Sequence, residues 1–217
     1  MKNYEVILFD LDGTLTDSKP GITKSVQYAL NKFGIIENDL EKLEHFVGPP
    51  LKDSFMHSYG FSEEKALTAV RYYREYFAEK GMFDNSVYPG IENLLKVLKE
   101  KGKRIAVATS KPTVYSISIL EHFGLYGYFD MVVGSNLDGT RTAKSEVIDC
   151  ALLEYRAYNK SQVVMVGDRM HDILGAKENG IDSVAVFYGY GTEKEISNCC
   201  PTYTVGSVQE LFNLLLG

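Results

Sequence analysis

Acidic residues follow two short apolar segments of this 217-residue sequence. Asp10 and Asp12 come directly after residues 6–9, and Asp168 comes just after residues 163–166. Carboxylates that are brought together repel one another unless a cation neutralises them. An all-oxygen site with few protein ligands suits Mg²⁺, which keeps several water ligands and binds one or two carboxylates together with phosphate oxygens. We therefore expect a Mg²⁺ site that handles a phosphate group.

Hydroxyl and cationic side chains follow two further apolar segments. Thr109, Ser110 and Lys111 come at the end of one of them, and Arg141 and Lys144 follow the other after a loop. Hydroxyl groups, ammonium groups and helix N-termini beside a magnesium site are the parts that phosphoryl transfer uses. The combination indicates a phosphoryl-transfer site, although each of these residues taken alone is more typical of a turn, a helix cap or a solvated surface.

The segments that must position these groups alternate between two kinds of pattern. Short runs rich in Val and Ile, without polar alternation, are typical of strands buried on both faces of a parallel sheet. Stripes of apolar residues at helical spacing lie between these runs, so right-handed crossovers predict an α/β fold with a doubly wound, three-layer core around a parallel sheet. The expected strands are residues 4–9, 104–109, 131–133, 163–166 and 183–186. Because ligands bind beyond the carboxyl ends of such strands, the polar residues are expected to converge on one crevice.

Residues 18–83 interrupt this alternation. They contain helical patterns at residues 21–33, 40–47, 52–59 and 62–80, with no convincing strand among them. The expected organisation is an α/β core formed by residues 1–17 and 84–217, with a small α-helical cap domain at residues 18–83 inserted after the first strand. Within the insert, the aromatic run at residues 72–77 is expected to pack between helices, and Lys52 and Arg71 are expected at the solvated surface.

The charge balance limits the classes of partner. The chain has 23 Lys and Arg against 29 Asp and Glu, a formal net charge of −6, which argues against a broad surface for a nucleic acid polymer or an anionic membrane. No segment is apolar for long enough to span a bilayer. Cys150, Cys199 and Cys200 lack the spacing of a disulfide framework or a zinc site. We expect a cytoplasmic protein, monomeric or homodimeric, whose partner is a small phosphorylated metabolite.

Four motifs resemble those of the haloacid dehalogenase superfamily, specifically its aspartate-nucleophile phosphatases with a helical cap. The run FDLDGTLTDS at residues 9–18 resembles the first motif, VATSK at residues 107–111 the second, and VGDRMHD at residues 166–172 the fourth. Lys144 is the best match for the lysine of the third motif, with Arg141 as its competitor. The segments VGPPL at residues 47–51 and VYPG at residues 87–90 look like the phosphoglycolate phosphatase branch.

This resemblance implies a role for each matching residue. Asp10 would attack phosphorus and become an aspartyl phosphate, while Asp12 would protonate the leaving oxygen and then take a proton from the hydrolytic water. Mg²⁺ would be held by the Asp10 carboxylate, the backbone carbonyl of Asp12 and Asp168. Asp172 would orient the lysine or a metal-bound water, with direct binding of the metal as the alternative. The phosphate group would be bound by Gly13, Thr109, Ser110 and Lys144.

The resemblance leaves several functions to compare. Asp12 favours a phosphate ester over a carbon–halogen bond, since a halide leaves without a proton whereas an alkoxide needs one. The leading expectation is a Mg²⁺-dependent phosphomonoester hydrolase with a phosphoglycolate-type substrate. A 5′-nucleotidase or a sugar-phosphate phosphatase is the alternative within the same chemistry. A non-catalytic phosphoacceptor, similar to a response-regulator receiver domain, is the alternative from another class.

Overall fold

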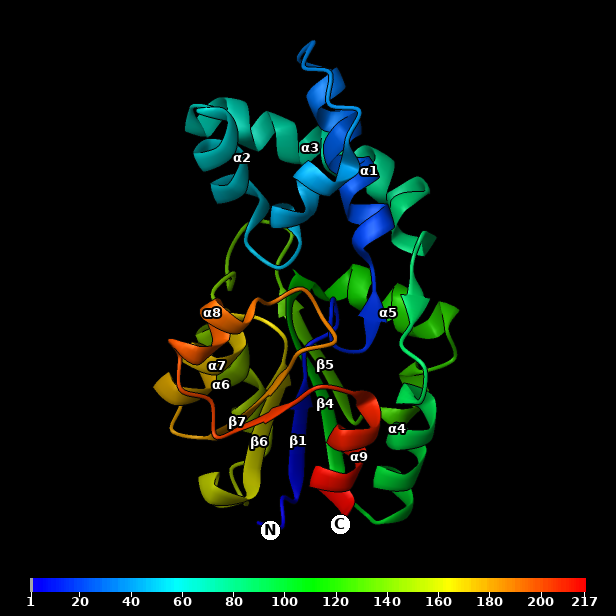
Figure 1. Ribbon diagram of the computed structural model, residues 1–217, viewed down its shortest axis with the longest axis vertical. Helices are drawn as coiled ribbons and strands as arrows, with labels where there is room; N and C mark the ends of the chain where they lie inside the picture. The colour runs from blue at the N-terminus through cyan, green and yellow to red at the C-terminus, as the bar shows by residue number, and fades with distance from the viewer. Residues whose placement is uncertain (1) are drawn as a thin grey trace. The chain divides into compact units, whose positions relative to one another are not determined.

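A six-stranded sheet is built from the short apolar segments of the chain (Figure 1). Every adjacent pair of strands in it is parallel, and the strand order is β5-β4-β1-β6-β7-β8. The computed structural model describes residues 2–217, and there the predicted doubly wound α/β core is confirmed. The strands are β1 (Val6–Phe9), β4 (Arg104–Pro112), β5 (Met131–Ser135), β6 (Val163–Gly167), β7 (Asp182–Val186) and β8 (Tyr203–Val205).

The strand order reverses at β1, and this places the carboxyl ends of the central strands together. From β1 the chain continues on one side to β4 and β5, and it later returns to the other side for β6, β7 and β8. The register pairs Phe9 of β1 with Val107 of β4 and with Val166 of β6. The edge beyond Phe9 is therefore the topological switch point, where an open parallel sheet binds its ligands.

Helices cover both faces of this sheet (Figure 1). α6 (Lys144–Glu154) and α7 (Met170–Glu178) pack together on one face, and α4 (Ile91–Glu100) and α9 (Val208–Leu216) lie on the other. Val6 and Leu8 of β1 are fully buried in one cluster with Val147 and Ile148 of α6, so their side chains hold α6 on the sheet through apolar burial. α8 (Glu193–Ser197) contacts α7, whereas the short 3₁₀ helix η3 (Tyr126–Tyr128) contacts α4 and α5 (Thr113–His122), and the 3₁₀ helix η4 (Lys160–Gln162) directly precedes β6.

Two details of the sheet differ from the sequence expectation. β4 continues to Pro112 instead of ending at Thr109, and its register against β5 shifts between Ala108 and Pro112. The final strand, β8, was not predicted, because three residues are too few to show a periodic pattern. It is recognisable only by its pairing with β7.

The second compact unit comprises Asp17–Ser86, and the first comprises Met1–Thr16 with Val87–Gly217. Where the chain passes between the units, β2 (Thr16–Asp17) and β3 (Ser86–Val87) pair as a two-stranded sheet. The second unit is otherwise helical over its described residues. Its elements are α1 (Lys19–Asn31), the 3₁₀ helix η1 (Leu40–Phe46), α2 (Leu51–Tyr59), α3 (Glu63–Glu79) and the 3₁₀ helix η2 (Gly81–Phe83).

The helical unit has its own aromatic core. Tyr73 and Phe77 of α3 are buried and stack with their ring centroids 5.3 Å apart, and the ring centroid of Tyr76 of α3 lies 5.4 Å from that of Tyr28 of α1, so the aromatic run packs between helices as predicted. Ser62 caps α3 by accepting a hydrogen bond from the backbone N–H of Lys65. Lys52 pairs with Glu63, and Arg71 is exposed, so neither shows more than surface contacts within this unit. That this unit acts as a cap stays a prediction.

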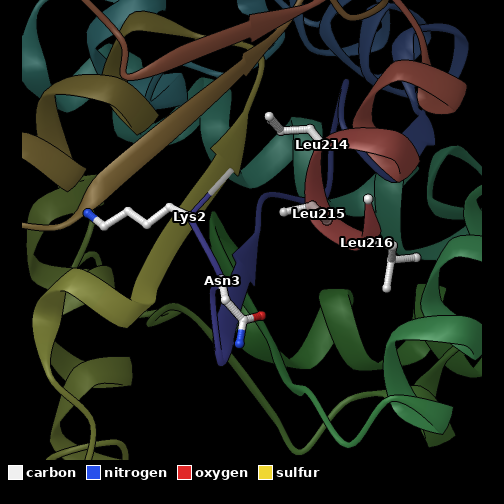
Figure 2. A pocket seen from close by; sticks show the side chains of 6 residues that line it. Lys2, Asn3, Leu214, Leu215 and Leu216 are labelled. Atoms are coloured by element: carbon white, nitrogen blue, oxygen red, sulfur yellow. The ribbon is translucent and has the colours of Figure 1, made fainter.

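One pocket lies at the amino ends of the strands (Figure 2). It has a volume of about 160 Å³. It contains no carboxylate, cysteine or histidine side chain, since its lining is Lys2, Asn3, Leu214, Leu215, Leu216 and Gly217. Lys2 and Asn3 precede β1, so this hollow is at the opposite edge of the sheet from Asp10. Along residues 2–217, no helix combines the length and the apolar character that crossing a bilayer requires.

Candidate active site

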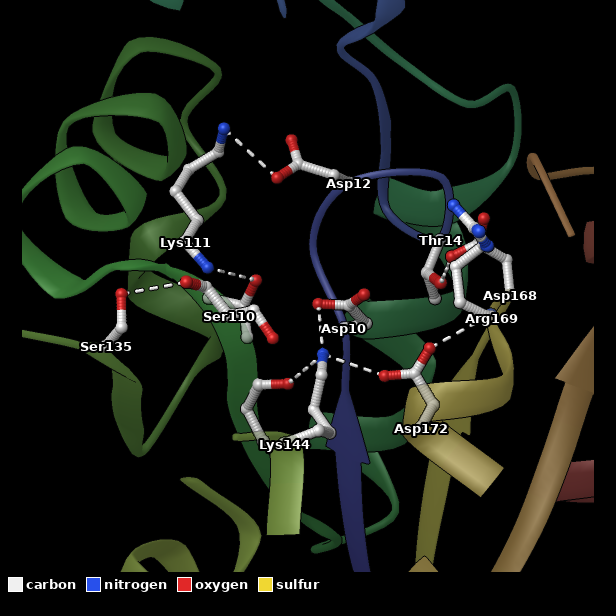
Figure 3. Close-up of polar contacts among 12 residues, drawn as sticks. Asp10, Asp12, Thr14, Ser110, Lys111, Ser135, Lys144, Asp168, Arg169 and Asp172 are labelled. Carbon is white, nitrogen blue, oxygen red and sulfur yellow. Dashed lines mark hydrogen bonds and ion pairs between the residues drawn. The ribbon is translucent and has the colours of Figure 1, made fainter. Parts of the chain in front are cut away.

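Polar residues from four segments meet beyond the carboxyl end of β1 (Figure 3). Asp10 follows β1 directly, and its backbone N–H donates to the carbonyl of Val166 in β6 at 2.9 Å. Asp168 follows β6, Lys144 is the first residue of α6, and Asp172 lies in the first turn of α7. The strand ends and helix starts of the first unit therefore supply the side chains that the motifs singled out.

Lys144 forms ion pairs with two of the carboxylates. Its Nζ lies 2.8 Å from Oδ1 of Asp10 and 2.7 Å from Oδ1 of Asp172, and it donates to the carbonyl of Ala108 at 3.1 Å. These three acceptors match the three protons of an ammonium group. Burial alone would favour the neutral amine, but the charges of Asp10 and Asp172 and their hydrogen bonds raise the pKa of Lys144. Lys144 is therefore a permanent positive charge beside Asp10.

Arg141, the competitor of Lys144, is engaged elsewhere. Its Nε donates to the carbonyl of Gly134 at 2.8 Å, and its Nη2 donates to Oδ1 of Asn136 at 3.1 Å. Its backbone is in the left-handed region, with a φ of 52°, in the loop before α6. The structure thus places Lys144, and not Arg141, against Asp10.

Asp10, Asp168 and Asp172 form a cluster in which one oxygen of each lies within 4.8 Å of the others. All three side chains are buried. Burial and the charges of Asp172 and Asp10 raise the pKa of Asp168 well above its ordinary value. Burial also raises the pKa of Asp172, and the Asp10 charge adds to this effect against the opposing ammonium of Lys144. Three carboxylates with one ammonium leave excess negative charge, so this all-oxygen donor set fits a divalent cation.

The loop after β7 surrounds Asp168. The backbone N–H of Tyr190 donates to Oδ2 of Asp168 at 2.8 Å, and the hydroxyl of Thr14 lies 3.4 Å from Oδ1. A Cβ atom on Gly189 would lie 2.4 Å from Cβ of Asp168, and one on Gly191 would lie 1.9 Å from its carbonyl oxygen. The sequence reasoning missed this loop, although two glycines flanking a tyrosine just after an apolar strand were a visible signal of close backbone packing.

Gly13 makes a second close approach to Asp168. Its φ of 80° is in the left-handed region, and a Cβ atom there would lie 2.2 Å from Oδ2 of Asp168. Its backbone N–H donates to the carbonyl of Thr16 at 2.8 Å, which turns the chain sharply after Asp12. Both the turn and the contact need a residue without a side chain. A phosphate-binding role for Gly13 stays a prediction.

Both oxygens of Asp172 are occupied by the chain itself. Oδ1 pairs with Lys144, and Oδ2 accepts a hydrogen bond from the backbone N–H of Arg169 at 3.0 Å. A Cβ atom on Gly167 would lie 2.2 Å from Cγ of Asp172, so the end of β6 packs directly on this carboxylate. This geometry fits a residue that orients Lys144.

Asp12 lies apart from the carboxylate cluster and has its own lysine. The Nζ of Lys111 is 3.0 Å from Oδ2 of Asp12, and both side chains are about nine-tenths buried. Oδ1 of Asp12 is buried and has no hydrogen-bond partner among residues 2–217. The sequence reasoning included Lys111 in the second motif without giving it a role.

The two hydroxyl residues of the second motif stand at the same strand end. Thr109 is 1% exposed, and its Oγ1 accepts a hydrogen bond from the backbone N–H of Lys111 at 3.3 Å. This contact uses an oxygen lone pair and leaves the hydroxyl proton for donation. The carbonyl of Ser110 accepts a hydrogen bond from the hydroxyl of Ser135 at 2.8 Å, which links the end of β4 to β5. Phosphate binding by Thr109 and Ser110 stays a prediction.

Curated relatives share most of the length of this chain. A 5′-nucleotidase from Pseudomonas aeruginosa is 48% identical over 212 residues, covering 98% of this chain and 96% of the relative. The tyrosine-protein kinase PtkA from Mycobacterium tuberculosis is 42% identical over 188 residues, covering 86% of this chain and 63% of the relative. Phosphoglycolate phosphatase 1 from Pseudomonas aeruginosa is 30% identical over 217 residues, covering 95% of this chain and 78% of the relative.

A solved structure and a family model agree with these relatives. The crystal structure of a predicted phosphatase from Clostridium acetobutylicum superposes with a TM-score of 0.94 at 53% sequence identity, covering 99% of each chain. The model of the haloacid dehalogenase-like hydrolase family matches residues 7–186, a range that includes every residue of the cluster around Lys144. The resemblance seen in the motifs is confirmed: the chain belongs to the haloacid dehalogenase-like hydrolase family and is a phosphatase.

Proposed function

We propose that this phosphatase is a Mg²⁺-dependent phosphomonoester hydrolase that acts on a small phosphorylated metabolite, with Asp10 as its nucleophile. The observation that carries the proposal is that the two aspartates after β1 form separate ion pairs with different lysines. Asp10 pairs with Lys144 beside Asp168 and Asp172, while Asp12 pairs separately with Lys111. One carboxylate thus lies beside an ammonium group and a set of oxygens that fits a divalent cation, which suits attack on phosphorus, and the other is set apart for proton transfer.

The first chemical step is attack of Asp10 on phosphorus. The P–O bond to the leaving group breaks as the bond to the Asp10 oxygen forms, and Asp12 gives its proton to the leaving oxygen. In the second step Asp12 takes a proton from water, which attacks the aspartyl phosphate and releases inorganic phosphate. Lys144 balances the charge of Asp10 and of the incoming phosphate throughout, since its ammonium group is held by Asp172.

The remaining residues would bind the phosphoryl group and the cation. Thr109 and Ser110 would donate hydrogen bonds to phosphoryl oxygens, and the backbone at Gly13 would contribute to the phosphate site. Asp10, the backbone carbonyl of Asp12 and Asp168 would hold Mg²⁺. When bound, the ion would supply positive charge that screens the nucleophile from the phosphate. The Tyr190 N–H would keep Asp168 oriented for this role.

Two substrate classes are supported by different observations. The segments at residues 47–51 and 87–90 favour a phosphoglycolate-type substrate. The 48% identity to a relative named 5′-nucleotidase favours a nucleoside 5′-monophosphate. Both are small anions that present a single phosphate ester, so the proposed chemistry serves either of them.

Phosphate release from a panel of esters tests the proposal. Phosphoglycolate, nucleoside 5′-monophosphates and sugar phosphates should be hydrolysed with Mg²⁺, and EDTA should stop the release. Ranking the panel by kcat/KM assigns the substrate class. During turnover, an acid-stable, hydroxylamine-labile phosphoryl group should appear on Asp10. Stoichiometric labelling that persists without phosphate release would instead indicate a receiver-like phosphoacceptor, and release without any adduct would exclude Asp10 as nucleophile.

A further inference from the structure

Each carboxylate of the loop after β1 has a lysine of its own (Figure 3). Lys144 approaches Asp10 from the start of α6, whereas Lys111 approaches Asp12 from the end of β4. The side chains of Lys111 and Asp12 are 6% and 10% exposed, so this second pair is almost as buried as the first. A buried ion pair contributes little net stability, because desolvation offsets most of the Coulomb attraction. Folding stability alone therefore gives no reason for Lys111 at this position.

The backbone holds Lys111 firmly in place. Its N–H donates to Oγ1 of Thr109, and the carbonyl of the residue before it accepts from the hydroxyl of Ser135. The register of β4 against β5 shifts in this segment. At the shift, a Cβ atom on Gly134 would lie 2.2 Å from the carbonyl oxygen of Lys111, so the two strands approach closely. The irregular strand end thus directs a lysine on an anchored backbone toward Asp12.

The contact between Lys111 and Asp12 distinguishes the two oxygens of the carboxyl group. An ammonium group only donates hydrogen bonds, so Oδ2 of Asp12 must act as the acceptor. Oδ1, the buried oxygen that has no partner among residues 2–217, is therefore the oxygen of Asp12 that this contact leaves for proton transfer. The same oxygen is available to accept a proton when the group is ionised.

We propose that Lys111 is a positioning residue that assigns proton transfer to Oδ1 of Asp12. This inference rests on the proposed acid–base role of Asp12. In the first step the proton on Oδ1 goes to the leaving-group oxygen, while the P–O bond breaks and the bond from Asp10 to phosphorus forms. In the second step Oδ1 takes the proton of the attacking water. Lys111 keeps its own protons in both steps and holds Oδ2 by a charge-assisted hydrogen bond.

The test compares leaving groups that differ in their need for a proton. Lys111→Met removes the donor but keeps an apolar stem of similar length, and Lys111→Arg keeps a cationic donor. An alkyl phosphate such as glycerol phosphate needs protonation of its leaving oxygen, whereas p-nitrophenyl phosphate needs little. In Lys111→Met, kcat/KM for the alkyl ester should fall about 10- to 100-fold, because part of the rate increase that general acid catalysis provides would be lost. For the aryl ester it should fall no more than about threefold, and Lys111→Arg should recover most of the difference.

The control is Lys99→Met, which removes a half-buried lysine paired with Asp130 at 2.8 Å in the same unit. It should leave both esters unaffected. An equal loss for the two esters in Lys111→Met, or no loss, would overturn the positioning role while leaving the hydrolase proposal intact. A wild-type chain inactive on every ester would overturn the hydrolase proposal itself.

The orientation of the Asp12 carboxyl group tests the positioning role of Lys111 without a measurement of turnover. Crystal structures of the wild type and of Lys111→Met should differ in the orientation of the Asp12 carboxyl group, and an unchanged orientation would overturn the inference. If Lys111→Met does not fold, Lys111→Gln retains a neutral donor of similar reach and serves in its place. The glutamine variant should then show a smaller loss on the alkyl ester than Lys111→Ala does, and equal losses would contradict the role.

Discussion

The backbone N–H of Tyr190 donates a hydrogen bond to Oδ2 of Asp168 at 2.8 Å, although the two residues are 22 positions apart. The contact brings the loop after β7 onto the carboxylate that follows β6. Oδ1 of the same carboxylate has a longer contact, 3.4 Å, to the Thr14 hydroxyl. Every residue except proline supplies this backbone donor, so the orientation of Asp168 depends on how closely this loop packs.

The packing of that loop predicts a loss of metal affinity. Gly189→Ala should weaken Mg²⁺ binding about tenfold or more, because a methyl group would lie 2.3 Å from the carbonyl of Gly13 and displace the loop from Asp168. Isothermal titration of the purified chain with Mg²⁺ measures the effect. Gly127→Ala is the matched control, since nothing lies within 4 Å of a Cβ atom there. Equal affinity in the two variants would contradict the role of the loop.

Asp10→Asn should abolish turnover and leave the fold intact. The amide is close to isosteric with the carboxylate, but it lacks the charged oxygen that attacks phosphorus. Phosphate release with Mg²⁺, measured beside a circular dichroism spectrum, checks both parts of the expectation. Asp138→Asn alters an exposed aspartate in the loop before α6 and should retain wild-type activity. Activity retained in Asp10→Asn would show that the nucleophile lies elsewhere.

Lys144→Met should destabilise the chain by about 3–5 kcal/mol, because it leaves Asp10 and Asp172 buried without their common counter-charge. Urea unfolding near neutral pH measures the loss. Adding Asp172→Asn should recover part of it, since one of the two buried charges is then removed. The loss should also shrink as pH falls, because a proton then neutralises Asp172, whose pKa is already raised by burial. A loss that is independent of pH would argue against this account.

Stabilisation by Mg²⁺ should increase with pH. Burial and the charges of Asp172 and Asp10 raise the pKa of Asp168 in the metal-free chain. Below this raised pKa a proton must leave before a cation binds, whereas above it the carboxylate is already ionised. The metal-free chain itself should lose stability as pH rises through this pKa, because a raised carboxyl pKa favours the folded state only while the group is protonated.

The measurement for this pH dependence is the thermal midpoint with and without Mg²⁺, at about pH 5 and about pH 8. The increase produced by Mg²⁺ should be larger at the higher pH. Asp168→Asn should remove most of the difference between the two values. An equal increase at both pH values in the wild type would mean that Asp168 does not bind the cation.

The fold was predictable because its signals are local. Residues buried on both faces of a parallel sheet leave short runs of Val and Ile, and the helices between them leave apolar stripes. The same is true of the first motif, where Asp10 and Asp12 follow an apolar strand and precede a turn-forming Gly13. Neighbours in the chain determine each of these features, so periodicity and spacing were sufficient to identify the family and the α/β core.

The choice of cation beside Asp10 was decided only by the tertiary structure. Arg141 and Lys144 are three residues apart, and both were candidates. The loop turns Arg141 back onto Gly134, and α6 begins at Lys144 with its side chain directed between Asp10 and Asp172. The pairing of Lys111 with Asp12 and the closure of the 189–191 loop on Asp168 likewise depend on strand ends that are far apart in the chain. Contacts of this kind leave no periodic pattern or fixed spacing in the sequence, because they form only when the sheet brings the ends of separate strands to one edge.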